Sequence, residues 1–567
     1  MPTDLAPLPL DRWLRHEEIG DLLRRWAGQR PGLLDVSSLG QSHEGRDIWL
    51  CTLTDRETGP AHEKPAVWVD ANLHATEITG SAAALHLVRQ LLAGHGADSR
   101  TTRALRTRTF YVAPRLNPDG AELALAERPR YVRSGVRPWP LPEPQPGLHE
   151  SDVDGDGRVL TMRIEDETGL WKRHPAEPRL LVPREPDEEE GGPFYRLLSE
   201  GHVVDYDGDL VKVAPALAGL DFNRNYPFDW RPAQEQEGAG PFPASEPEVR
   251  AAVQALVDRP NVTHVLAYHT FGAVHLRPWG GKPDDEMLPA DLAVYERIGR
   301  EATRITGYPS VSVYHHFLYE PKQYMRGAFD EWAYDHFGIY GWTTEFWSPM
   351  RAAGVDIGLR FIDWWKDHPV EDDLRILAWS DRELGGAAFV DWYPFEHPQL
   401  GRVELGGWDW MYALGNAPLP LLEAEIAPHA ELAVWLALIS PRLELRRLDA
   451  EPLGDGVHRV RLVVQNTGWL PSNLSERALE RKAVRPVEAE IELPATARLA
   501  SGQARVELGQ LAGRPRSAST LGWYAGQEPS DERARCEWVV EAPAGTTARV
   551  TVRHPRAGTR RGEVRLG

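Results

Sequence analysis

Short apolar runs alternate with amphipathic stretches along the chain as far as about residue 350. The apolar runs predict buried strands at LLDVSSLG (33–40), RDIWLCTLT (46–54), 65–72, 262–270 and 339–346, and at 109–120, which runs into a turn. Apolar positions at helical spacing predict helices at 12–29, 79–94, 245–257, 287–306 and 325–337. Because strands that alternate with helices are typical of α/β folds, we expect a mixed, mostly parallel sheet flanked by helices.

Two regions depart from this alternation. Residues 136–220 are rich in proline, glycine and acids, as in WPLPEPQPG and PREPDEEEGG, and predict a long irregular insertion on the surface. From 441 onward, short segments such as VHRVRLVVQNTG and TARVTVRHP alternate apolar and polar positions, which predicts an antiparallel β-sandwich. We therefore expect an α/β domain at 1–440 and a sandwich domain at 441–567, whose role no motif indicates.

Composition narrows the class of protein. The 567 residues are 42% hydrophobic and 26% charged, which is ordinary for a globular chain with a large core. The net charge of −20 argues against a nucleic-acid partner, because phosphate binding needs a concentrated basic surface. Two cysteines, Cys51 and Cys536, exclude a disulfide framework. Since neither a signal peptide nor a membrane-spanning apolar run is visible, we expect a cytoplasmic protein without membrane contact, unless the start is truncated.

Polar residues follow or end several predicted strands. His74, Asn117, His269 and Glu345 all lie at the carboxyl ends of strands, where α/β folds place their active sites. A catalytic zinc needs three protein ligands and an open position, and His74, Glu77 and His269 could supply the ligands. Taken alone, a structural histidine and a carboxylate near a helix dipole explain the same residues. Neither H-E-x-x-H nor G-x-S-x-G occurs, so those two hydrolase sites are absent.

The order of several motifs along the chain favours a metal site over the structural explanation. They are HATE (74–77), NPDG (117–120), RYVR (130–133), DFNRNYP (221–227), SEPEVRA (245–251), AYHTFGAVHLRPWG (267–280) and TTEF (343–346). Together they resemble, from about residue 12 to 350, the zinc carboxypeptidases of the carboxypeptidase A type. The resemblance implies a zinc-dependent hydrolase that removes the C-terminal residue of a peptide with a free carboxylate.

The same resemblance implies the metal site. Zinc would be held by His74, Glu77 and His269, and Asp221 would orient the imidazole of His74. One carboxylate and two neutral imidazoles leave the zinc with a net charge of +1, which lowers the pKa of its bound water towards neutrality.

Further roles are implied for residues around the metal. Glu345 would be the general base for the water and later the proton donor to the leaving amine. Arg133 would stabilise the oxyanion that develops on the scissile carbonyl. Asn223 and Arg224 would bind the free carboxylate of the substrate, for which the planar fork of arginine is suited.

In this family the floor of the side-chain pocket lies in the segment that here reads RGAFDEWAY. Aligning Gly327 and Asp330 with the family pattern places Phe329 at the floor, which predicts a preference for hydrophobic C-terminal residues. A shift of one residue would place an acid there and favour lysine or arginine. The tyrosine that covers the substrate in this family is expected at Tyr319 or Tyr324.

A second metal is predicted from DVDGDGRVLTMR (152–163), which begins like a calcium loop. Asp152, Asp154 and Asp156 offer oxygens, and Gly157 allows the sharp turn. Arg163 stands where the bidentate acid is expected, so Glu165, Asp166 or the acids of DYDGDL (205–210) would have to replace it. A loop of this composition that binds nothing is the alternative.

Two other functions remain open from the sequence. An amidase of cell-wall peptides or a deacylase of N-acyl amino acids could use the same zinc ligands. A non-catalytic binding module could keep the fold, although neither a ligand nor the base is missing. No motif indicates a macromolecular partner or an oligomeric state.

Overall fold

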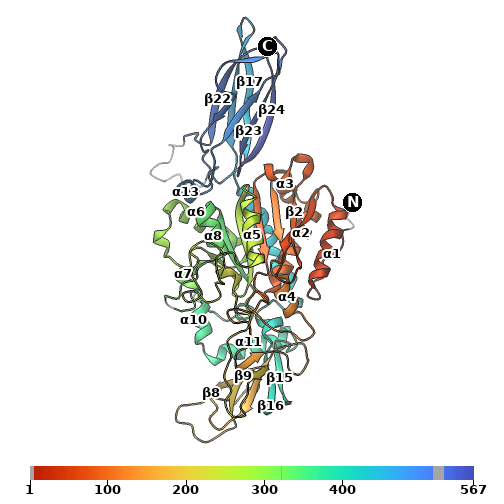
Figure 1. The fold of residues 1–567 in the computed structure, drawn as a ribbon, viewed down its shortest axis with the longest axis vertical. Helices are drawn as coiled ribbons and strands as arrows, with labels where there is room; N and C mark the ends of the chain where they lie inside the picture. Colours follow the sequence, from red (N-terminus) through yellow and green to blue (C-terminus); the bar gives the residue numbers. More distant parts are fainter. Residues whose placement is uncertain (1–4, 321, 360, 515–528) are drawn as a thin grey trace.

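Three units follow one another along the long axis of the molecule (Figure 1). The computed structural model describes residues 5–320, 322–359, 361–514 and 529–567. A central α/β unit carries a β-sandwich at one end and a small antiparallel sheet at the other (Figure 1).

The central sheet is mixed, as predicted. Its strands lie in the order β1 (Leu34–Gln41), β2 (Asp47–Leu53), β4 (Thr109–Ala113), β3 (Ala66–Ala71), β11 (Val262–Thr270), β14 (Tyr340–Phe346), β12 (Val274–Arg277) and β13 (Ser310–Ser312). The inner strands β4, β3, β11 and β14 are parallel to one another. Their carboxyl ends therefore meet at one edge of the sheet.

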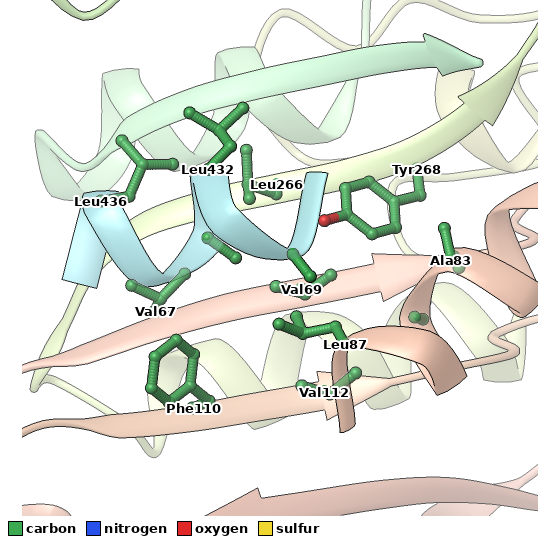
Figure 2. Packing of buried hydrophobic residues seen from close by; sticks show 14 of the residues in the cluster. Val67, Val69, Ala83, Leu87, Phe110, Val112, Leu266, Tyr268, Leu432 and Leu436 are labelled. Carbon is green, nitrogen blue, oxygen red and sulfur yellow. The ribbon is translucent and has the colours of Figure 1, made fainter. Parts of the chain in front are cut away.

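Helices bury both faces of this sheet, which is why its inner strands are continuous apolar runs. On one face α2 (Ile78–Gly94) and α12 (Leu419–Ile439) pack on Val67, Val69, Phe110, Val112, Leu266 and Tyr268 (Figure 2). On the other face α5 (Pro247–Val257) and α8 (Phe329–Phe337) cover Trp68, Val265 and Ala267. The remaining α-helices of this unit are α1 (His16–Gln29), α3 (Ser99–Thr107), α4 (Pro118–Ala124), α6 (Pro289–Thr306), α7 (Val313–His316), α9 (Pro349–Ala352), α10 (Phe361–Lys366) and α11 (Val370–Glu383).

None of the described helices combines the length and the apolar character that a membrane crossing requires.

The insertion at 136–220 is more regular than predicted. Its strands β6 (Thr161–Glu165), β7 (Trp171–Arg173), β8 (Leu181–Pro183) and β9 (Phe194–Ser199) join β15 (Phe389–His397) and β16 (Gly401–Trp408) in one sheet, and β5 (Gly147–Glu150) pairs with β10 (Gly201–Val204). The prediction of an irregular segment was wrong because one of these short strands, β6, finds its partner β16 far along the chain, and the others join the sheet through β6. Met162 and Leu405 lie in the small core that this pairing creates.

The C-terminal unit is the predicted antiparallel sandwich. One sheet contains β17 (Leu443–Gly454), β18 (Val457–Asn466), β22 (Arg533–Glu541) and β20 (Arg498–Ser501), and the other β21 (Arg505–Glu507), β19 (Glu488–Glu492), β23 (Thr547–His554) and β24 (Gly558–Arg565). Side chains of β18 alternate between buried and half-buried, which is the pattern read from the sequence. Before α13 (Glu476–Glu480), the Ser475 hydroxyl donates to the carbonyl of Gly338 at 2.7 Å, so the sandwich is joined to the central unit.

Candidate metal centre and active site

The candidate site lies at the carboxyl edge of the parallel strands. His269 and Glu345 are each the last residue but one of their strands, β11 and β14. They are register partners across this parallel pair, so their side chains leave the sheet next to each other on the same face. His74 follows the adjacent strand β3 by three residues.

The loop that carries His74 and Glu77 is held by its own side chains. Asn72 adopts a left-handed φ of 54°, which asparagine tolerates, and its amide donates to the carbonyl of His74 at 2.7 Å. The backbone N–H of Ala75 donates to the carbonyl of Arg133 at 3.0 Å. A side chain at Gly120 would come within 2.6 Å of the carbonyl of Ser134, so glycine is required where NPDG meets this loop.

The three predicted zinc ligands come together. Nδ1 of His74 lies 2.7 Å from Oε1 of Glu77 and 3.0 Å from Nδ1 of His269. Nδ1 of His269 lies 2.8 Å from the second oxygen of Glu77. All three side chains are buried, and their donor atoms lie within 4.8 Å of one another.

The chemistry of this donor set fits zinc. Nε2 of His74 donates to Asp221 at 3.1 Å, which leaves Nδ1 of His74 with a lone pair. Nε2 of His269 has no hydrogen-bond partner among the described residues, and its Nδ1 faces the same point as the other two ligands. Two imidazole nitrogens and a carboxylate that converge in a buried site are stabilised by a cation between them. Zinc in catalytic sites takes this kind of ligand set.

The two acids of this cluster are held ionised. Burial would raise the pKa of the Glu77 carboxyl, but His74 and His269 hold that pKa below its ordinary range. Burial would also raise the pKa of Asp221, but Arg133, Arg224 and His74 hold that pKa well below its ordinary value. Both carboxylates are thus ready to bind a cation or an imidazole N–H.

The pKa of Glu345 is shifted in the opposite direction, above its ordinary value. Burial raises the pKa of its carboxyl to about 8, because the opposing effect of His269 is smaller and Glu77 adds repulsion. A carboxyl with a pKa near neutrality can both accept and return a proton at physiological pH. Its position beside His269 places this proton acceptor at the donor set.

Two arginines lie beside the cluster. Nε of Arg133 contacts Oδ2 of Asp221 at 3.1 Å and Nη1 contacts Glu77 at 3.4 Å, while 43% of the Arg133 side chain is exposed. Arg224 is buried, and its Nη1 donates to the carbonyl of Asn223 at 2.8 Å. The Oδ1 of Asn223 accepts from the backbone N–H of Phe329 at 3.0 Å, which leaves its amide N–H groups to bind a ligand.

The register predicted for the pocket floor needs correction. Phe329 packs its ring against Tyr226 and Trp332 in the core, at centroid distances of 5.1 and 6.2 Å. Asp330 lies instead against Gly341 of β14, where an added Cβ would be 3.1 Å from that of Asp330. Because side chains alternate along a strand, Gly341 shares its face with Glu345. Phe329 is therefore part of the core, whereas the carboxyl of Asp330 is among the charged groups that raise the pKa of Glu345.

The charge on Asp330 is consistent with this placement. Burial raises the pKa of Asp330 to about 6, and His269 and Arg224 are among the groups that oppose the rise. Its side chain has no ion-pair partner among the described residues. Glu331 points elsewhere, since its Oε1 accepts from the backbone N–H of Gly280.

The two tyrosines considered for covering the substrate lie in different surroundings. Tyr324 stacks on Tyr314 with an interplanar angle of 11°. Burial raises the pKa of the Tyr319 phenol, and Arg133 and Arg224 lie close enough to oppose that rise. Of the two, Tyr319 is the one beside the site arginines.

The predicted calcium loop offers three carboxylates. Atoms of Asp152, Asp154 and Asp156 lie within 4.8 Å of one another. Arg163, which stands where the bidentate acid is expected, pairs with Glu404 at 2.8 Å, and one of the acids considered as a replacement, Asp166, pairs with Arg196 at 2.9 Å. Calcium at this loop stays a prediction.

Other motif residues are structural, and one buried acid was missed. The carboxylate of Asp119 accepts from the hydroxyl of Ser42, the backbone N–H of Glu44 and the guanidinium of Arg46, so the acid of NPDG anchors the SHEGR turn. Asp70 was not singled out from the sequence, although it is an acid in a buried strand. Its carboxyl accepts from Nε1 of Trp68 at 2.7 Å, and burial raises its pKa to about 7 against the effect of His269.

Comparisons with known proteins match this chain to zinc carboxypeptidases. A family model described as zinc carboxypeptidase matches residues 19–354, more than half of the 567 residues. A model described as a domain of unknown function (DUF8731) matches residues 442–565, the sandwich. Carboxypeptidase D of Homo sapiens is 33% identical over 143 residues, which cover 22% of this chain and 10% of that protein.

Two further similar proteins are also described as carboxypeptidases. A zinc carboxypeptidase of Saccharothrix mutabilis subsp. capreolus is 30% identical over 104 residues, covering 18% of this chain and 24% of that protein. The chain therefore matches only a small part of the length of either relative. Among solved structures, the carboxypeptidase A from Helicoverpa armigera has 18% identity and a TM-score of 0.39, over 68% of this chain and 77% of that chain.

Proposed function

Because the chain belongs to the zinc carboxypeptidase family, we propose that it removes C-terminal residues from peptides by zinc-dependent hydrolysis. One observation carries the proposal: a buried His–Glu–His donor set lies beside Glu345, the register partner of its second histidine. The exposed side of Arg133 and the free amide of Asn223 border the same set, so a peptide end can be held against it.

Each residue has a defined part in this proposal. His74, Glu77 and His269 would hold zinc, which supplies a Lewis acid that polarises the scissile carbonyl and activates water. Glu345 accepts a proton from the attacking water at a carboxylate oxygen and later donates it to the leaving nitrogen. Arg224 and Asn223 bind the free carboxylate of the substrate. Arg133 places its guanidinium where negative charge develops on the carbonyl oxygen.

A substrate panel tests this activity. The zinc-loaded full chain is incubated with peptides that have a free or an amidated C-terminus, with and without a chelator. We expect free amino acids to be released only from free C-termini, and release to stop when zinc is removed. Turnover confined to acyl or γ-linked amide bonds would show an amidase or deacylase instead. A chain that binds zinc without any turnover would be a binding module.

We also propose that Asp330, rather than Phe329, sets the residue that is removed. A buried carboxylate that no cation neutralises favours the ammonium or guanidinium of a C-terminal lysine or arginine. We expect kcat/KM to be higher for peptides ending in lysine than for those ending in leucine. In Asp330→Asn this ratio should fall by at least about 30-fold, because losing one partner of a buried charge pair costs about 2–5 kcal/mol.

The ratio also has an expected pH dependence. Since the pKa of Asp330 is raised to about 6, the carboxyl gains a proton as the pH falls through that value, and the lysine preference should decrease below it. Using the ratio cancels any titration of Glu345, which affects both peptides equally. Glu331→Gln is the matched control, because burial already raises the pKa of Glu331 well above its ordinary value and keeps it neutral. A leucine preference in the unaltered chain would refute the assignment.

A further inference from the structure

A basic pocket lies where the central unit meets the sandwich. It has a volume of about 760 Å³ and is lined by Thr58, Ser99, Arg103 and Arg106 from the central unit and by Arg442 and Arg560 from the sandwich. Helix α3, which carries three of these residues, lies at the end of the central unit that faces the sandwich (Figure 1). The volume is typical of pockets that bind small molecules.

Two of the lining arginines, Arg103 and Arg560, have no acidic partner among the described residues. Arg103 and Arg106 are one helical turn apart on α3, so their guanidinium groups lie on the same face. Arg106 is 3.9 Å from Asp55, whereas no carboxylate lies within ion-pair distance of Arg103 among the described residues. The one acid in the lining, Asp98, is engaged, since it caps α3 by accepting from the N–H of Thr101 at 2.6 Å.

The second arginine without an acidic partner, Arg560, comes from the sandwich and is separated from its neighbour by the alternation of side chains along a strand. Arg561 of β24 pairs with Glu63 of the central unit, with its Nη1 at 2.7 Å from Oε2. Arg560, its neighbour, points to the other side of the strand and donates only to the carbonyl of Thr559 among the described residues. Arg442 also lines the pocket and pairs with Glu444 at 2.7 Å.

Further positive charge lies beneath the pocket. Arg108 is buried, and burial together with Arg442, Arg560 and Arg103 lowers the pKa of its guanidinium to about 9. The ammonium of Lys64 is also buried and donates to the hydroxyl of Thr58 at 2.8 Å. In a chain of net charge −20, these cations are nevertheless concentrated here, and Asp55 and Glu444 offset only part of their mutual repulsion.

We propose that this pocket binds a small anion with more than one phosphate group, which joins the sandwich to the central unit. Arginine forks bind phosphate oxygens in pairs, and the unpaired Arg103 and Arg560 come one from each of the two units. The hydroxyl of Ser99 adds a donor for the same oxygens. A polyphosphate and a bisphosphorylated metabolite share this chemistry.

Calorimetry on the zinc-loaded full chain tests the proposal with two probes, tripolyphosphate and fructose 1,6-bisphosphate. We expect one molecule to bind per chain, to bind more weakly as salt increases, and to raise the Tm. The tighter of the two probes identifies the source of the phosphate. Arg103→Gln and Arg560→Gln should each weaken binding by at least about tenfold, because each removes one charge-assisted contact.

Two comparisons make the result decisive. Arg25→Gln removes an exposed arginine of α1 and should leave binding unchanged. Arg560→Lys keeps the charge but not the fork, so binding between that of Arg560→Gln and the unaltered chain is expected. Absence of saturable binding at low salt would overturn the proposal. The proposal would also be overturned if the double variant of Arg103 and Arg560 gave the same heat as the unaltered chain. That heat would come from extraction of zinc by the probes and not from binding in the pocket.

Discussion

Replacing Glu345 by glutamine should lower kcat by about a thousandfold, within the roughly 10²–10⁴-fold that general acid–base catalysis contributes. The amide has the same shape but cannot take a proton from water. Because Glu345 is not among the three residues whose donor atoms converge, zinc content should stay at one per chain. The measurement is kcat on a C-terminal lysine peptide together with metal analysis of the same preparation.

A second buried glutamate provides the control for this variant. Glu248 of α5 has a pKa that burial raises to about 7, and it accepts from the backbone N–H of His43, away from the donor set. Glu248→Gln should therefore retain kcat, which separates loss of the base from loss of a buried carboxyl. If Glu345→Gln loses zinc as well as rate, Glu345 holds the metal and the assignment of the base is wrong.

Replacing His269 by alanine should remove zinc and activity together. The substitution leaves only His74 and Glu77 in the donor set, so the loss of zinc affinity should exceed the roughly 10–100-fold that loss of an outer partner costs. Zinc occupancy is measured by metal analysis after dialysis against a weak chelator. Added zinc in excess should restore part of the occupancy without restoring the geometry needed for turnover.

His264 gives the matched control on the same strand. It is a fully buried histidine of β11 whose Nδ1 contacts the hydroxyl of Thr263 at 3.0 Å. His264→Ala creates a cavity of similar size and should lower the free energy of unfolding by about 2–5 kcal/mol, as large-to-small core substitutions do, while zinc stays bound. Equal zinc content in both histidine variants would exclude His269 from the metal site.

Much of the central fold could be predicted because its signals are local. Strand β11 has the bounds predicted for it, since a strand buried on both faces is a continuous apolar run. The sheet that contains the insertion could not be predicted in this way. Its strands β6 and β9 are short, and β6 pairs with β16, which is separated from it by the segment that carries His269 and Glu345.

The residues of the site, like the elements of the fold, could be predicted only in part. The roles of His74, Glu77, His269 and Glu345 were predicted from the resemblance of several motifs, taken in order, to the zinc carboxypeptidases. Which residue of α8 approaches them was not readable, because one step along a helix turns a side chain by about 100°, so an error of one residue exchanges an apolar group for an acid. Packing against Tyr226 places Phe329 in the core and directs Asp330 to Gly341.

The sequence by itself determined the strands and helices of the central sheet, because burial periodicity is a property of neighbouring positions, and the resemblance of its ordered motifs implied the metal-binding residue types. Tertiary structure alone decided which distant surfaces meet. The basic pocket is the clearest case, since Arg103 and Arg560 belong to different units and no periodic pattern relates them. Charges that lie far apart in sequence interact only after the units have packed, and their energy depends on distance and burial rather than on order in the chain.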